Sequence, residues 1–214
     1  MGLPAPPWPS LLLVGPTGAG KTPLGEEIEK RGLQGRICVH FDFGANLRRA
    51  ARGAAAEFGL TGPEIERIRD SLRSGALFES GDLAMITKIL RRFIETRRLG
   101  RGGLLVLNGL PRHRDQAEAL APFLAVERVV SLEADAPIIV DRIRRDPGQD
   151  RAGRPDDDLP AVARRLETFR QRTAPLLEFY RDRGVPVTAV PVTAAMTAGD
   201  MYAELERHLR TGGR

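Results

Sequence analysis

Residues Gly15 to Thr22 read GPTGAGKT, and their types and spacing suit the binding of phosphate groups. Glycines let successive backbone N–H groups point at phosphate oxygens, and a helix that follows such a loop adds the positive end of its dipole. A lysine at this spacing reaches the β- and γ-phosphates of a nucleotide, and the hydroxyl after it can ligate Mg²⁺. The expected phosphate contacts are Gly15, Gly18, Ala19, Gly20, Lys21 and Thr22.

A second segment that could bind an anion is NGLPRHRDQ, residues 108–116, which follows the apolar run LLVL. Open α/β sheets bind ligands at the carboxyl ends of their strands, so Arg112 in this loop indicates an anionic ligand. Gln116 falls at the exposed start of a predicted helix, a position that requires no function by itself. The segment alone does not identify the anion.

Short, β-branched apolar runs predict the strands that must position these loops. They cover residues 10–15, 36–41, 103–109, 128–134 and 185–190. Strands that are apolar throughout are typical of parallel sheets covered on both faces. Helical patterns lie between them, at 23–32, 80–100, 114–124, 136–146 and 159–183. This alternation predicts an α/β fold with a doubly wound, parallel five-stranded sheet.

Two connections are too long for plain crossovers between parallel strands. Residues 42–92 contain extra helices, one of which begins at the segment TGPE, 61–64, a capping box with proline in the first turn. Residues 146–158, DPGQDRAGRPDDD, are polar and rich in Gly, Pro and Asp, and they predict a loop. Asp156 and Asp157 could cap the helix that begins near Leu159, or they could help to order this loop.

The composition favours one α/β domain with small insertions, or two modest domains. Apolar residues make up 42% of the 214 residues, enough for a sizeable core. The single cysteine, Cys38, excludes an intramolecular disulfide framework and a multi-cysteine zinc site, which favours a cytoplasmic setting. No apolar run reaches membrane-spanning length, and the first residues lack the basic segment of a signal peptide.

The net charge of +5 fits either nucleic acid or a cleft that holds several phosphates. The arginines are spread along the chain rather than gathered in blocks, which makes a nucleic-acid partner the weaker expectation. His40, His113 and His208 are isolated, without a second ligand at metal spacing, and we expect them to be structural or exposed.

Four further segments follow the P-loop in a fixed order: HFDFGANLR at 40–48, NGLPRHRDQAEAL at 108–120, IVDRIRRD at 139–146 and GRPDDDLPAVARRLETFRQRTAPLLEFY at 153–180. Together they resemble the adenylate kinase, or nucleoside monophosphate kinase, family over essentially the whole chain. The resemblance implies a P-loop kinase-type core at 1–41, 93–142 and 158–214. It also implies an inserted helical domain for the acceptor monophosphate at 42–92 and a short lid at 143–157.

The resemblance also implies an activity and a partner for each site. The enzyme would use Mg²⁺ and transfer the γ-phosphoryl group of ATP to a nucleoside monophosphate, and AMP is the expected acceptor. Lys21, Arg154 and Arg165 would be the catalytic residues, and Arg142 would stack on the ATP adenine. The acceptor would be held by the arginines at 48 and 112, with Gln116 reading its base. The full acceptor set is Gly44, Arg48, Gly109, Arg112 and Gln116.

The chemistry of this transfer fits the residue types. Donor and acceptor are both anions, and the acceptor phosphate oxygen is already ionised near neutral pH, so no general base is required. Catalysis then consists of positioning and charge stabilisation, which guanidinium groups and Mg²⁺ supply. Closure of the inserted domain and the lid would exclude water from the transfer.

The sequence departs from the family pattern at several positions. Phe43 replaces a small hydroxyl residue beside the acceptor base, and Asp146 stands where the family has another arginine, for which Arg145 or Arg151 could substitute. Asn108 replaces an aspartate near the metal. We therefore expect Thr22 and, through water, Asn108 to hold Mg²⁺ more weakly than usual, unless another carboxylate such as Asp42 takes the role.

These departures leave alternatives open. The acceptor could be CMP, UMP, dUMP or a small metabolite. The chain could also be a nucleotide-binding regulator with little turnover, an alternative supported by Asn108 and Asp146. A nucleic-acid-associated ATPase is a third alternative, supported only by the basic charge. We expect a monomer, since the sequence shows no coiled coil and no apolar seam.

Overall fold

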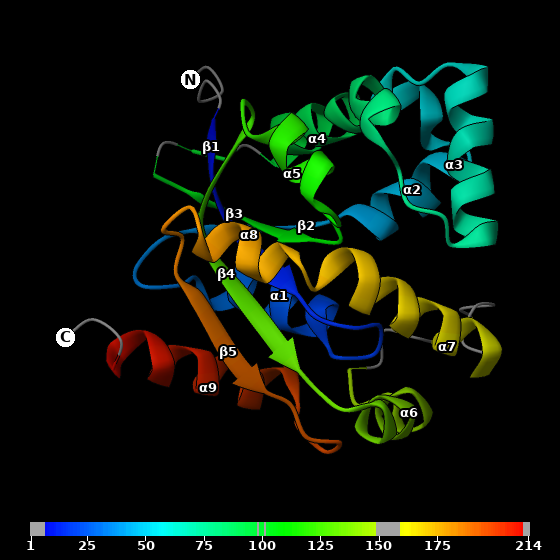
Figure 1. Ribbon diagram of the computed structural model, residues 1–214. Helices are drawn as coiled ribbons and strands as arrows, with labels where there is room; N and C mark the ends of the chain where they lie inside the picture. Colours follow the sequence, from blue (N-terminus) through cyan, green and yellow to red (C-terminus); the bar gives the residue numbers. More distant parts are fainter. Residues whose placement is uncertain (1–6, 98, 101, 149–158, 212–214) are drawn as a thin grey trace.

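The computed structural model describes residues 7–97, 99–100, 102–148 and 159–211 (Figure 1). A five-stranded sheet lies at its centre, with strands in the order β2-β3-β1-β4-β5 and every pairing parallel. The strands are β1 (Trp8–Val14), β2 (Cys38–Asp42), β3 (Leu104–Asn108), β4 (Leu124–Glu133) and β5 (Val187–Pro191). The predicted fold class is confirmed, and the strand ends differ from the expected ones by a few residues.

Helices cover both faces of the sheet, which explains why the central strands β1 and β3 are almost entirely buried. In β1, Leu12 points into one cluster of buried side chains, while Leu11 and Leu13 point into the other, and each is no more than 2% exposed. The first cluster includes residues of α4 (Leu83–Arg97), α5 (Arg114–Leu120) and α8 (Leu176–Arg181). The second includes residues of α1 (Lys21–Arg31), α6 (Ala136–Arg145) and α9 (Ala198–Thr211).

The long connection after β2 forms the expected extra helices. They are α2 (Phe43–Ala51), the 3₁₀ helix η1 (Ala54–Phe58), α3 (Gly62–Ser74) and the 3₁₀ helix η2 (Ser80–Asp82), which leads into α4. The predicted capping box starts α3: the Thr61 backbone N–H donates to Glu64 Oε2 at 2.7 Å, with Pro63 in the first turn. In Figure 1, α2 and α3 lie beyond the β2 edge of the sheet, far from β5 and α9.

Two predicted helices are shorter than the sequence pattern suggests. The pattern at 114–124 ends as α5 at Leu120, because Pro122 cannot donate a backbone hydrogen bond and Leu124 already begins β4. The pattern at 159–183 divides into α7 (Leu159–Thr168), the π-helical turn η3 (Phe169–Thr173) and α8.

Pro175 accounts for the second division, because it too has no N–H to donate into the preceding turn. The backbone N–H of Ala174 donates to Phe169 O at 2.8 Å, a wider ring than an α-helix makes. Within the described parts of the chain, no helix is long and apolar enough to cross a membrane. Most of the expected loop and lid, with Arg151, Arg154, Asp156 and Asp157, lies outside the described residues.

Candidate active site

A cleft of about 600 Å³ opens where β1, β2 and β3 end, and segments far apart in the chain meet there. The P-loop forms its floor, α2 and residues 71–78 form one wall, and the ends of α6 and α7 contribute the other. It brings together most of the residues predicted from the sequence: Gly15, Gly18, Gly20, Lys21, Thr22, Gly44, Arg48, Asn108, Gly109, Arg112, Gln116, Arg142 and Arg165. Ala19 is not among the lining residues, and its N–H donates to Pro16 O at 3.3 Å.

The P-loop takes its shape from glycines in the left-handed region and from one lysine. Gly18 has φ +81° and Gly20 has φ +97°, values that L side chains rarely adopt. The ammonium group of Lys21 donates to Gly15 O at 2.7 Å and to Pro16 O at 2.8 Å. The lysine begins α1, so its charge and the positive end of the helix dipole lie at the same end of the cleft.

Thr22, Asp42 and Asn108 form a closed triangle of hydrogen bonds beside the P-loop. The Thr22 hydroxyl donates to Asp42 Oδ2 at 2.8 Å, and the Asn108 amide nitrogen donates to both Thr22 Oγ1 (2.9 Å) and Asp42 Oδ2 (3.2 Å). The triangle forms because β2 and β3 are neighbours in register, so their last residues, Asp42 and Asn108, are paired. Mg²⁺ prefers oxygen ligands, and it is often held by carboxylates together with the phosphate oxygens of a nucleotide. The Thr22 hydroxyl and the Asp42 carboxylate beside the P-loop therefore fit the metal that the family resemblance implies.

Asp42 is the residue that the sequence reasoning did not place in the site, except as a possible substitute. The available signal was its position: a carboxylate at the carboxyl end of a predicted strand, and Asn108 ends the next strand in the sequence. Its other oxygen, Oδ1, accepts the Ala45 N–H at 2.7 Å and thereby caps α2.

Three of the predicted arginines line the cleft from different elements. Arg48 extends from α2 along Gly44, where an added Cβ would lie 3.2 Å from Arg48 Nη1. Arg112 and Arg165 come from the loop after β3 and from α7. Burial, and then repulsion from the Arg165 charge, lowers the pKa of Arg112 to about 10. Both residues line the cleft, and an anion bound between them would relieve the repulsion between their charges.

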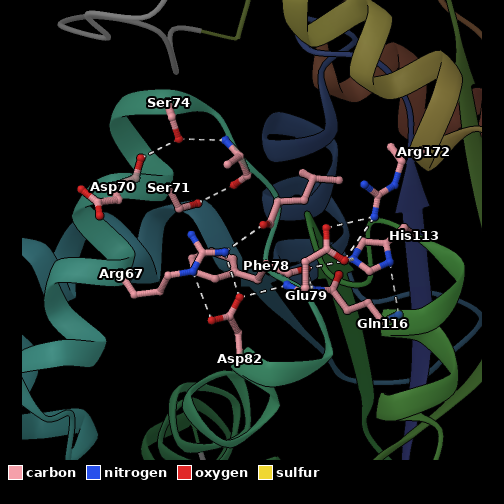
Figure 2. Close-up of polar contacts among 12 residues, drawn as sticks. Arg67, Asp70, Ser71, Ser74, Phe78, Glu79, Asp82, His113, Gln116 and Arg172 are labelled. Carbon is pink, nitrogen blue, oxygen red and sulfur yellow. Dashed lines mark hydrogen bonds and ion pairs between the residues drawn. The ribbon is translucent and has the colours of Figure 1, made fainter.

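Gln116 lines the cleft, but its amide makes bonds inside the protein. It is 3% exposed, its Oε1 accepts the Arg112 backbone N–H at 2.6 Å, and its Nε2 donates to Phe78 O at 3.4 Å. Figure 2 shows His113 beside it, with ring Nε2 2.8 Å from the same Phe78 oxygen. As expected, His113 is structural: it caps α5 through a hydrogen bond from the Gln116 N–H to its Nδ1 at 3.4 Å.

Apolar side chains from α2 and from residues 71–78 line one wall of the cleft. The rings of Phe43 and Phe78 meet edge to face, with centroids 5.6 Å apart, and Leu47, Leu72 and Leu77 line the same side of the cleft. Phe43 is 3% exposed and belongs to the core beneath α2 as well as to the cleft. An acceptor base on this wall would therefore meet carbon atoms more than polar groups.

Arg142 is held by backbone oxygens on both sides. It is 3% exposed, and it donates to Gly18 O at 3.2 Å, to Thr193 O at 2.7 Å and to Met196 O at 2.9 Å. It thereby joins the P-loop to the segment before α9, and stacking on adenine stays a prediction. Of its neighbours, Asp146 ends α6 in the left-handed region (φ 43°) and lines the cleft.

Arg145, one expected substitute for the missing family arginine, points to the surface and pairs with Asp141 at 2.9 Å. It is not among the residues that line the cleft. The other expected substitute, Arg151, falls in the part of the chain that the structure does not describe.

No protein-family model matches this chain, but curated proteins align with most of its length. It is 36% identical over 184 residues to a protein of Synechococcus sp. (strain WH7803), covering 83% of this chain and 87% of that one. It is 32% identical over 181 residues to one of Caulobacter sp. (strain K31), covering 82% and 86%. Both proteins are named adenylate kinase. At such identity over so much of its length, the chain belongs to the adenylate kinase family and is a nucleoside monophosphate kinase.

Proposed function

We propose that this kinase transfers the γ-phosphoryl group of Mg²⁺·ATP to AMP. The observation that carries the proposal is that Arg112 and Arg165 line the same cleft as the P-loop, where burial, and then repulsion from the Arg165 charge, lowers the pKa of Arg112 to about 10. Two cations directed at one space favour a dianionic phosphate between them, and guanidinium groups bind phosphate in a bidentate manner. The relatives named adenylate kinase support AMP as the acceptor.

In this proposal, one set of cleft residues binds the donor, ATP, and another set binds the acceptor monophosphate. The P-loop amides and Lys21 hold the β- and γ-phosphates of ATP, while Arg48 and Arg112 hold the acceptor phosphate at the other end of the cleft. Arg165 lines the same cleft and would neutralise charge on the group in transfer. Mg²⁺, when bound, neutralises charge on the ATP phosphates. The acceptor oxygen is already ionised, so no side chain has to remove a proton.

Another monophosphate is a second candidate acceptor, for a specific reason. Gln116, the residue expected to read the adenine, already uses both ends of its amide inside the protein. With Phe43 at the neighbouring position, the base wall offers carbon contacts that CMP, UMP or dUMP could also use. The proposal includes a monomer in the cytoplasm, in keeping with a single, buried cysteine, Cys38.

A coupled assay with Mg²⁺·ATP and a panel of AMP, CMP, UMP and dUMP tests the proposal. We expect turnover with AMP to exceed the others. Lys21→Ala should lower kcat by roughly 10²- to 10³-fold, the usual effect of removing one preorganised charge. Arg73→Ala is the matched control, because Arg73 is exposed and pairs only with Asp70 among the contacts described for it.

Each other outcome selects a different function. Faster turnover with a pyrimidine monophosphate would replace AMP by that acceptor. Nucleotide binding without turnover on any acceptor would make the protein a regulator, and ATP hydrolysis stimulated by RNA or DNA would make it a nucleic-acid-associated ATPase.

A further inference from the structure

The carboxylate of Asp42 caps α2, but a cap does not require a full negative charge, and that charge stands in a cleft proposed to bind phosphates. Among the described residues that line the cleft, only Asp42 and Asp146 carry a carboxylate. Asp42 is half-buried and lies beside the P-loop, where its charge would repel the phosphates of ATP. A cation between the carboxylate and the phosphates would turn this repulsion into attraction.

The orientation of Asp42 is fixed by bonds on both sides of its carboxyl group. Oδ1 accepts the Ala45 N–H at 2.7 Å, which caps α2, and this contact directs Oδ2 toward the Thr22 hydroxyl 2.8 Å away. Thr22 is the P-loop hydroxyl that would ligate Mg²⁺. Oδ2 therefore lies beside the expected metal position.

The position of Asn108, next to Asp42, explains why an amide suits this place better than a second carboxylate. Its nitrogen donates to Asp42 Oδ2 at 3.2 Å and to Thr22 Oγ1 at 2.9 Å, and it is 5% exposed. An aspartate in its place would put two carboxyl groups at hydrogen-bond distance, where one must be protonated or move away. An amide avoids this repulsion and holds Asp42 in position.

We propose that Asp42 is the metal-site carboxylate of this kinase and that Asn108 is its positioning residue. The negative charge that the family resemblance places at the end of β3 is thus supplied from the end of β2. This inference rests on the proposed Mg²⁺·ATP site but not on the identity of the acceptor. It reverses the expectation that Asn108 leaves the metal weakly held.

Three variants separate Asp42 from Asn108: Asp42→Asn, Asn108→Asp and the double variant that exchanges the two residues. Asparagine is also a good N-cap, so Asp42→Asn keeps the start of α2. The readout is the dissociation constant of a fluorescent, non-hydrolysable ATP analogue, measured with excess Mg²⁺ and again with a chelator. The ratio of the two constants reports metal coupling without any catalysis.

For Asp42→Asn we expect the Mg²⁺-dependent gain in affinity to fall at least about tenfold, a common effect of losing one group around a metal. The metal-free analogue should bind as tightly as to the wild type, or more tightly, because the repelling charge is gone. That second result distinguishes a metal role from a structural one, which would weaken both affinities. Asn108→Asp alone should not increase the gain, and the exchange variant should recover a large part of it.

Asp146→Asn is the matched control, because it removes the other described cleft carboxylate and should leave the gain unchanged. An unchanged gain in Asp42→Asn, or a larger one in Asn108→Asp, would overturn the inference. Binding of Mg²⁺·ATP with no turnover on any acceptor would overturn the proposed function while leaving this inference intact. A wild type that does not bind the analogue at all would overturn both.

Discussion

At the scale of single residues, the site is built from cations held near one another. Arg112 is half-buried and lines the same cleft as Arg165, and its backbone N–H donates to the Gln116 side chain. The geometry of each guanidinium group should therefore matter as much as its charge. A lysine would preserve the charge and lose the planar pair of donors.

Arg112→Lys tests that distinction. We expect the KM for the monophosphate to rise at least about tenfold, the equivalent of roughly 1.4 kcal/mol, while the KM for ATP changes little. Initial rates with each substrate varied in turn supply the measurement. Arg73→Lys, on an exposed face of α3, is the control and should change neither constant. An equal rise in both constants would place Arg112 away from the acceptor.

At the scale of elements, the position of α1 over β2 depends on one glycine. A Cβ on Gly25 would lie 2.3 Å from Nε2 of His40. The His40 side chain is buried (8% exposed), so neighbouring atoms restrict any movement of its ring away from α1. Burial lowers the pKa of His40, so the ring packs against the helix in its neutral form. This close approach sets the distance between α1, which carries Thr22, and β2, which carries Asp42.

Gly25→Ala should therefore destabilise the fold, although alanine favours an isolated helix by about 1 kcal/mol over glycine. We expect the unfolding free energy to fall by about 1–3 kcal/mol, the usual range for overpacking a core. Urea unfolding of Gly25→Ala, His40→Val and the double variant measures the coupling. In the His40→Val background, the alanine should be neutral or stabilising. The same loss in both backgrounds would mean that the contact between Gly25 and His40 is not the cause.

The elements also show how far the sequence alone could lead. The apolar strands and the P-loop were predictable because each is a local pattern. The triangle of Asp42, Thr22 and Asn108 was not, since it depends on which strands become neighbours. The internal bonds of Gln116 depend on the Phe78 carbonyl, 38 residues away in the chain. The π-helical turn interrupts a pattern that has helical periodicity throughout, so only Pro175 gave a signal.

At the scale of the whole molecule, one cluster of charges joins the inserted helices to the core. Glu79 precedes η2, and its carboxylate accepts from Arg172 of η3 at 3.0 and 3.2 Å and lies 3.4 Å from His113 Nε2 (Figure 2). Since Glu79 and Arg172 are about half exposed, the pair should contribute at most about 1 kcal/mol to stability. Its effect should instead be on the position of residues 75–82 at the edge of the cleft.

Glu79→Gln should lower the unfolding free energy by less than about 1 kcal/mol, because the pair is exposed. It should nevertheless increase amide hydrogen exchange in residues 75–82, which lose a contact with the core. Hydrogen-exchange mass spectrometry checks this result. Glu118→Gln, which breaks similarly exposed pairs with Arg114 and Arg183, is the control and should leave that segment unchanged. Unchanged exchange in Glu79→Gln would show that other contacts hold the segment.

The repulsion between Arg112 and Arg165 has a consequence for thermodynamic linkage. A ligand that binds only the folded state adds about 2.7 kcal/mol to the free energy of unfolding when its concentration is a hundred times its dissociation constant. The melting temperature therefore rises with the ligand concentration. Sulfate or inorganic phosphate should therefore raise the melting temperature more than chloride at equal ionic strength, and Arg112→Met should reduce the difference. Calorimetry in matched buffers would measure it, and equal melting temperatures would argue against an anion between the two arginines. The stability of the fold would then depend on the phosphate compounds around it, as well as on its own sequence.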